Sequence, residues 1–202
     1  MMGMSIPYEA TGRTKQKART RAALIRAARD HLASGTTPTV EQAADAAQVS
    51  RTTAYRYFPN QRALIVATFP ELASASLLPE PPSEDPGARL DAVVEALTRQ
   101  LVEHEPELRA HLRLSLEPGD DRPELPFRTG RAIGWIKEAL APLRGRMSEQ
   151  DLHRLVLAIR SAVGIEAMVW LTDIAALSRD EAVDLMRWSA RALLRSALAE
   201  TA

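Results

Sequence analysis

The sequence predicts an all-α protein of about nine helices. Ala, Leu, Arg and Glu dominate the chain, and no stretch shows the period-two alternation of a β-strand. Prolines gather at two places, with four between Pro79 and Pro86 and three between Pro118 and Pro126. Because proline cannot continue the interior of a helix, these clusters are the strongest breaks in the chain. We therefore expect helical segments on both sides of each break.

Four helices are expected before the first break. Gly35 is a typical residue to follow a helix C-terminus. Thr39 and Gln42 have the spacing of a capping box, while Ser50 and Asn60 are good N-cap residues. The predicted helices are 14–34, a short helix through QAADAA (42–47), 50–58, and a helix from position 60 to about 72.

Five helices are expected after the first break. Pro106 separates the first two, Ser148 opens a long helix, and Ser178 with Glu181 forms a second capping box. The predicted helices are 88–104, 106–116, 127–143, 148–173 and 178–199. The first proline cluster thus divides the chain into an N-terminal domain, 1–75, and a C-terminal domain, 84–202.

Composition excludes several classes of protein. The 202 residues are 46% hydrophobic and 26% charged, which is typical of a globular chain. The absence of cysteine excludes a disulfide scaffold, a thiolate zinc site and a cysteine nucleophile. No apolar run approaches the roughly 18 residues that cross a bilayer, and the first 23 residues lack the apolar core of a signal peptide. We expect a soluble, cytoplasmic protein with no membrane partner.

The charges are unevenly distributed, although 26 basic and 26 acidic residues sum to a formal charge of zero. Residues 1–62 contain ten basic and four acidic side chains, a balance of +6, and residues 63–202 carry −6. Such asymmetry favours a polyanion-binding segment joined to an acidic body.

The segment from Thr39 to Tyr57 has the layout of a helix-turn-helix, with two short helices joined by a tight turn. Val49, Ala54 and Phe58 can face inward and hold the second helix. Arginine, threonine and tyrosine are side chains that contact base edges and phosphates. The residues left at or near the outer surface are Arg51, Thr52, Thr53, Tyr55, Arg56 and Tyr57.

The run TVEQAADAAQVSRTTAYRYFPNQRAL resembles the DNA-binding signature of the TetR (tetracycline repressor) family of bacterial transcriptional regulators. The resemblance covers about residues 14–69 and is carried by Val49-Ser50, Thr53, Tyr55, Tyr57-Phe58 and Leu64. It implies a helix-turn-helix domain joined to a helical domain for ligand binding and dimerisation.

The resemblance also implies roles for single residues. Arg51, Thr52 and Arg56 would approach base edges, while Thr39, Thr53, Tyr55 and Tyr57 would hold the sugar-phosphate chain. Ser50, at the start of the recognition helix, and Gln61, at the start of the next helix, complete the expected DNA-binding set.

Three positions depart from the family's usual pattern. Gln48 and Thr52 stand where glycine is common. The turn is therefore expected either to place Gln48 in a left-handed conformation, at a cost of about 1 kcal/mol, or to be slightly reshaped, and Thr52 is expected to change the approach to the bases. Gln61 replaces a lysine that commonly contacts phosphate, and whether Arg62 substitutes for that lysine is open.

A dimer surface is expected because palindromic DNA sites are bound by two-fold dimers. The last two helices are the best candidates, and the alternative is that their apolar residues form the core of a single subunit. The predicted interface residues are Leu155, Ile159, Val163, Val183, Met186, Ala190, Leu193, Leu194 and Ala197.

An effector pocket among the middle helices is implied by the resemblance. Glu166 is predicted on an apolar helix face, where a buried carboxylate needs a partner. Trp135, Met168 and Trp170 are candidates for an apolar lining, with plain core residues as the alternative. His104, His111 and Arg113 are candidate polar anchors, with both histidines expected to be solvated if they bind no ligand. No group of residues has a metal-binding spacing, so neither metal nor cofactor is expected.

The sequence thus predicts a homodimeric repressor of transcription. It would bind a palindromic operator in double-stranded DNA and be released by an unknown small-molecule effector. One alternative keeps the fold but gives the acidic part a binding function without DNA release, such as protein contact. The other is a helical enzyme, which is not favoured because the chain has no glycine-rich phosphate loop, no nucleophile elbow and no cysteine.

Overall fold

The structure is a computed structural model that describes residues 8–68, 75–116 and 131–200, with side chains from Thr14 onward. Among these residues it contains helices and no strand, which confirms the all-α prediction. The α-helices are α1 (Tyr8–Ala33), α2 (Val40–Ala46), α3 (Arg51–Tyr57), α4 (Gln61–Thr68), α5 (Pro86–Glu103), α6 (Glu105–Leu116), α7 (Arg131–Ala139), α8 (Glu149–Ala162), α9 (Ile165–Val169) and α10 (Arg179–Glu200).

Helix starts follow the predicted caps. Thr39 and Gln42 form the reciprocal capping box of α2, and the hydroxyls of Ser50 and Ser148 accept from backbone N–H groups in α3 and α8. The Asn60 carboxamide oxygen accepts from the N–H of Ala63. In the second predicted box, Ser178 and Glu181 bond reciprocally before α10. Local sequence therefore determines where these helices begin.

The single helix predicted for 148–173 is wrong. The structure ends α8 at Ala162, and Val163 and Gly164 are extended before α9 begins. A Cβ built on Gly164 would lie 2.1 Å from Nη1 of Arg160, which donates to the carbonyl of Val163. The folded Arg160 side chain thus occupies space that only glycine leaves open.

This break also bears on the membrane prediction. Glu149–Ile174 is long and apolar enough to span a bilayer by length and composition, with a mean hydropathy of 1.6. In the structure this stretch is divided into α8, α9 and a π-helical turn, Trp170–Ile174. Its buried side packs against α7 and α10 as part of the protein core.

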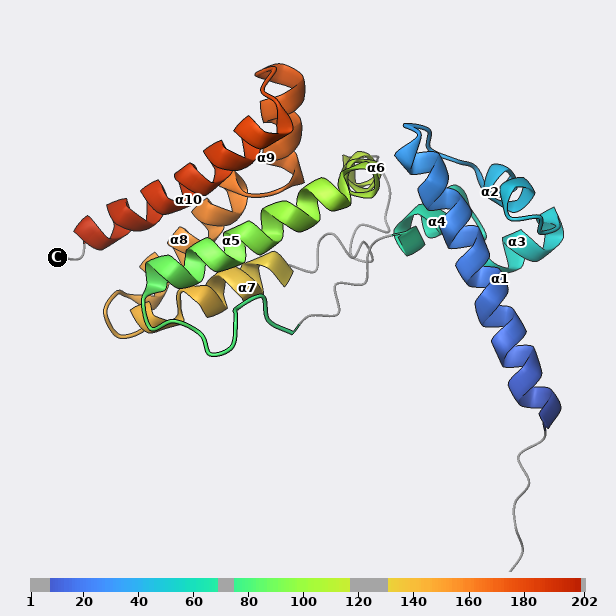
Figure 1. Cartoon of the computed structure of the whole chain (residues 1–202), viewed down its shortest axis with the longest axis horizontal. Helices are drawn as coiled ribbons and strands as arrows, with labels where there is room; N and C mark the ends of the chain where they lie inside the picture. Colours follow the sequence, from blue (N-terminus) through green and yellow to red (C-terminus); the bar gives the residue numbers. More distant parts are fainter. Residues whose placement is uncertain (1–7, 69–74, 117–130, 201–202) are drawn as a thin grey trace, which may run out of the picture.

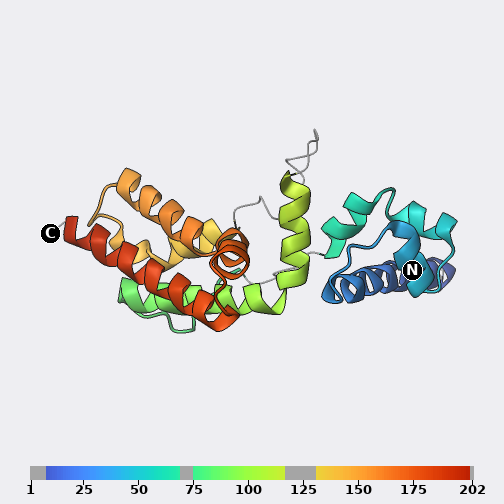
Figure 2. The same cartoon turned by 90° about the horizontal axis from the view of Figure 1, so that it is seen from above.

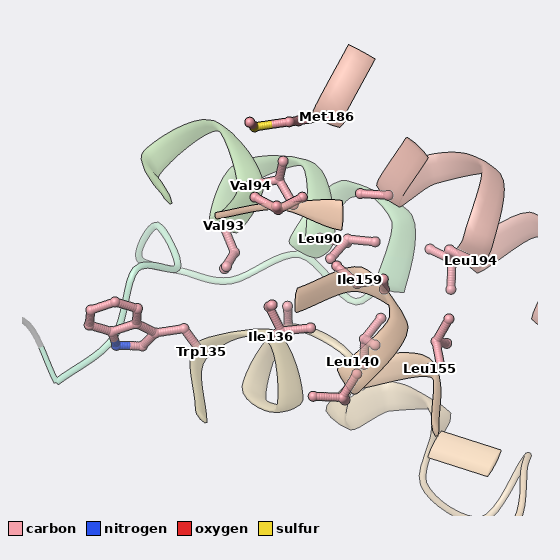
Figure 3. Close-up of a cluster of buried hydrophobic side chains, with 14 of the residues drawn as sticks. Leu90, Val93, Val94, Trp135, Ile136, Leu140, Leu155, Ile159, Met186 and Leu194 are labelled. Atoms are coloured by element: carbon pink, nitrogen blue, oxygen red, sulfur yellow. The ribbon is translucent and has the colours of Figure 1, made fainter. Parts of the chain in front are cut away.

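The helices surround two hydrophobic cores at opposite ends of the molecule (Figure 1). The smaller core lies within α1–α4 and includes Leu24, Ala54, Phe58 and Leu64. The larger core lies in a ring in which α5 packs on α7, α7 on α8, α8 on α10 and α10 on α5. Figure 3 shows side chains from these four helices meeting in the larger core.

Helix α6 lies between the two units (Figure 2) and contacts both α1 and α4. A separate small cluster forms there from Leu32 of α1, Ile65 of α4, and Ala110 and Leu114 of α6, all at most 6% exposed. The position of the N-terminal unit on the rest of the chain therefore depends on this face of α6.

Three arginine side chains donate hydrogen bonds to carbonyl groups at the C-termini of other helices. Arg29 of α1 donates to the carbonyl of Thr68 at the end of α4, and Arg62 of α4 donates to the carbonyl of Leu114 in α6. Arg89 of α5 donates to the carbonyls of Ala139 and Glu138 in α7. Each guanidinium meets carbonyls that have no partner within their own helix, where a cation is also favoured by the helix dipole.

Most residues of the predicted dimer interface are buried within the single chain. Six of the nine residues have at most 5% of their surface exposed in the single chain, so they have no surface left for a partner. They belong to the larger core, which is the alternative considered above. The six core residues are Leu155, Ile159, Val163, Met186, Ala190 and Leu194. Val183, Leu193 and Ala197 remain partly exposed.

We predict that Ile159→Ala lowers the free energy of unfolding by about 2–5 kcal/mol, because Ile159 is fully buried and its truncation leaves a cavity. His153→Ala, on the exposed face of the same helix, should change it by less than about 0.5 kcal/mol. Urea unfolding at one fixed protein concentration measures both values. Equal, small effects of the two substitutions would mean that Ile159 is not a core residue.

Candidate nucleic-acid interface and effector residues

Helices α2 and α3 form the predicted helix-turn-helix. The chain turns at Ala47 to Val49, and Gln48 has a φ of 53°, the left-handed conformation that is one of the two alternatives expected at this position. The N–H of Val49 donates to the carbonyl of Ala44 and closes the turn. A non-glycine residue in this region costs about 1 kcal/mol, which the packing around the turn offsets.

Helix α3 has one buried side and one exposed side. Ala54 is fully buried, the C-cap Phe58 is 3% exposed, and Val49 packs partly buried against the same core, as predicted. The remaining polar side chains of α3 lie at the surface and include no acidic residue. Arg51, Thr52, Tyr55 and Arg56 are exposed, while Thr53 and Tyr57 are partly exposed.

Tyr55 has a carboxylate partner that the sequence did not suggest. Its hydroxyl donates a short hydrogen bond to Glu41 of α2, and this bond raises the pKa of Tyr55. The same bond, together with hydrogen bonds from the backbone and Thr39, lowers the pKa of Glu41, which is therefore ionised at neutral pH. A negative charge thus lies beside the recognition helix, where a phosphate would meet repulsion.

Two hydroxyls of the expected DNA-binding set also serve the fold. The Thr39 oxygen accepts from the N–H of Gln42. The Ser50 hydroxyl accepts from the N–H of Thr53 and donates to the Thr53 hydroxyl. Each oxygen is thus held at the start of a helix before any nucleic acid is bound.

Gln61 and Arg62 point into the protein. The Gln61 amide donates to the carbonyls of Pro38, at 3.0 Å, and Thr37, at 3.4 Å. Arg62 is directed toward α6, where it donates to Leu114. Gln61 thus bonds to the loop before α2, and Arg62 bonds to α6.

The positive charge of the N-terminal unit is concentrated on the first turns of α1. Lys15, Lys17, Arg19 and Arg21 are all exposed, and the Arg21 guanidinium lies 5.7 Å from the centre of the Phe58 ring. This stretch of α1 extends beyond the body of the unit (Figure 1). Of these charges, that of Arg21 lies close to the end of α3.

Within the described part of the chain, the predicted effector residues lie in different surroundings. Trp135 and Met168 are core residues, at 5% and 0% exposure, and Trp170 is 57% exposed. Glu166 is also exposed, and it pairs with Arg160 at 3.2 Å, so the prediction of a buried carboxylate is wrong. The break at Gly164 is the reason, because it turns Glu166 away from the apolar face of α8.

His104, which directly precedes α6, and His111, which lies within α6, differ in their surroundings. His104 is partly exposed, whereas His111 is fully buried between α6 and α4, against the expectation that it is solvated. Burial lowers the pKa of His111 to about 4, although a hydrogen bond with the Ile65 backbone opposes the shift. His111 is therefore a neutral residue of the contact between the two units.

An ion-pair network that the sequence prediction missed joins α6 to the start of α10. Glu105 is 4% exposed and is bound by Arg109, at 2.7 Å, and by Arg179, at 2.5 Å. Burial raises the pKa of Glu105, but the bonds from Arg179 and Arg109 outweigh burial and the net shift is downward. Arg109 also binds Asp173 at 2.6 Å, which lowers the pKa of that carboxyl to about 2. Of these ion pairs, only Glu105–Arg109 could be predicted from the sequence, because its two residues are four apart on one helix.

Among the residues that the structure describes, no group of three or more His, Asp or Glu side chains is placed to hold a metal ion.

We predict that the protein loses stability as the pH falls below about 6.5. In the unfolded chain His111 has its ordinary pKa near 6.5, so unfolding takes up a proton between that value and about 4. The free energy of unfolding should fall by about 2 kcal/mol between pH 7 and pH 5. His111→Gln should flatten this dependence, while His104→Gln should preserve it. An unchanged pH dependence in His111→Gln would show that another group is responsible.

No protein-family model matches this chain, and no curated protein sequence matches it. Its structure is similar to the crystal structure of a TetR-family transcriptional regulator from Streptomyces coelicolor, with 19% sequence identity and a TM-score of 0.48. The match covers 89% of this chain and 98% of that chain.

Proposed function

We propose that this chain is a DNA-binding transcriptional regulator, a homodimeric repressor of the TetR type that binds a palindromic operator. The observation that carries the proposal is the outer side of α3. Arg51, Thr52 and Arg56 are exposed there, whereas Ala54 is buried and anchors the helix. An exposed helix with two arginines and no acid, held at the end of a tight turn, suits the major groove.

The side chains of α3 divide into two roles. Arg51, Thr52 and Arg56 contact base edges, since all three are exposed and, in the described part of the chain, none has a partner such as the one that Tyr55 has in Glu41. Thr53 and Tyr57 are half-buried at its sides and contact phosphates, together with Thr39 and Ser50 at the helix starts. Tyr55 contacts phosphate only after its hydroxyl leaves Glu41.

The dimer surface is the outer side of α8 and α10. Leu157 of α8 is 42% exposed, and Leu185 and Trp188 of α10 are 37% and 59% exposed. A groove of about 530 Å³ runs between the two helices and includes Leu193 and Ala197 in its lining. Exposed aromatic and aliphatic side chains on these two helices favour a helical interface between two copies.

Release of DNA follows from differential binding of an effector. An effector weakens operator binding only if it prefers a conformation that DNA disfavours. Because α6 contacts α1 and α4, a change in its position alters the spacing of the two α3 helices in a dimer. Such a regulator acts in the cytoplasm, where bacterial DNA lies.

We predict that selection from random double-stranded DNA yields a palindromic sequence. Arg51→Ala should lose about 1–3 kcal/mol of discrimination at one position of each half-site, whereas Tyr57→Phe should weaken all sequences similarly. Arg99→Ala, on the exposed side of α5, is the matched control and should bind as the unchanged protein does. Titrations at one fixed salt concentration measure these effects. Recovery of no enriched sequence would overturn the proposed function.

We predict that Trp188→Glu converts the dimer to a monomer, because it places a charge in the centre of the proposed interface. Leu116→Glu introduces the same charge at an exposed residue of α6, far from α8 and α10, and should leave the dimer intact. Sedimentation at micromolar concentration distinguishes the two species. A dimer in both variants would exclude the outer side of α10 as the interface.

A further inference from the structure

A cleft lies where the N-terminal unit meets the helical body. It encloses about 530 Å³, a volume within the range of small-molecule sites. Leu32 and Thr36 belong to its α1 side, while Val102 of α5, Pro106 of α6 and Arg179 of α10 belong to the opposite side. A molecule held in this cleft touches both units at once.

The charges that line the cleft leave one cation uncompensated. Glu105 binds Arg179 and Arg109, and Asp173 binds Arg109 from outside the cleft. These four groups carry equal numbers of positive and negative charges. Arg113, one helical turn beyond Arg109, is exposed and makes no ion pair or hydrogen bond with another residue in the described parts of the chain.

The rest of the lining is largely apolar. Val102 is 41% exposed and lines this cleft with Leu32, Pro106 and Ala110. Covering such a patch is favourable in proportion to the apolar area removed from water. The cleft therefore offers an apolar wall beside the Arg113 guanidinium, which has no ion-pair partner among the described residues.

From this geometry we propose that the cleft binds a monoanionic carboxylic acid with an apolar body. The carboxylate binds Arg113, whose planar guanidinium suits two-point contact with a carboxylate, and the apolar body covers Val102 and Pro106. A dianion is disfavoured because Glu105 and Asp173 already neutralise the other two arginines. The proposal rests on the proposed function in one respect, since it gives the effector of that regulator a site and a chemical class.

The position of the cleft explains how such a ligand would act on DNA binding. Its walls are the end of α1 and the face of α6, next to the cluster of Leu32, Ile65, Ala110 and Leu114. A ligand that fills the cleft fixes the distance between these helices. Its binding is thereby coupled to the orientation of α3, and DNA binding changes ligand affinity by the same factor.

Calorimetric titration of the full chain with octanoate, in the absence of DNA, tests the site. Octanamide, which has the same carbon chain without the charge, is the matched probe. We expect saturable octanoate binding at least about tenfold stronger than octanamide binding, because the guanidinium contact is charge-assisted. Arg113→Gln should abolish that difference, and Val102→Glu should weaken octanoate binding further by placing a like charge on the apolar wall. Arg99→Gln, an exposed arginine of α5 outside the cleft, should bind octanoate as the unchanged chain does.

Three results would each overturn the proposal: no saturable octanoate binding up to about 10 mM, equal affinity for the two probes, or unchanged affinity in Arg113→Gln. Both variants alter exposed side chains, and their melting temperatures show whether they are folded. Operator binding is measured separately on the same proteins. Failure to bind any DNA with intact octanoate binding would reject the proposed function and keep the site, and the reverse pattern would reject only the site.

Discussion

The packing of α6 against α1 and α4 is the contact on which the arrangement of the molecule depends. Leu32, Ile65, Ala110 and Leu114 form a small dry cluster between two larger cores that are otherwise separate. Only a few apolar side chains stabilise this contact, so little apolar area is buried in it. The neutral His111 is buried within the same contact. The contact is therefore the part of the structure most open to being shifted by a ligand or a proton, since larger cores resist such changes.

The arginines explain why net charge alone is a poor guide to the surface of this protein. Arg29 and Arg62 contribute to the excess of +6 in residues 1–62, yet both donate to helix carbonyls inside the structure. Among the described residues, the charge available to a polyanion is that of Lys15, Lys17, Arg19, Arg21 and Arg26 on α1 and of Arg51 and Arg56 on α3. The surface of the N-terminal segment is thus positively charged, but its accessible charge is smaller than the sum of +6 over residues 1–62. Glu41 reduces the positive charge further beside α3.

Apolar helical stripes were ambiguous between core and interface, and the structure resolves the ambiguity by topology. Helices α8 and α10 each pack on neighbouring helices of the same subunit, so their apolar stripes are buried within the chain. What remains exposed is Leu157, Leu185 and Trp188, which lie off those stripes. The prediction that Glu166 is buried was wrong for a related reason, because the break at Gly164 turns Glu166 away from the apolar face of α8.

The sequence by itself determined the all-α class, the caps of α2, α3, α4, α8 and α10, and the buried side of α3. These features depend on residues within a few positions of one another, where backbone geometry and hydrogen-bonding capacity leave few choices. Only the tertiary structure decided the partners of Arg62, Arg89, Glu105 and Tyr55, the burial of His111 and the cleft beside Arg113. Each of these depends on helices that meet after folding, and the spacing of residues along one chain does not specify which long polar side chain will reach which neighbouring helix.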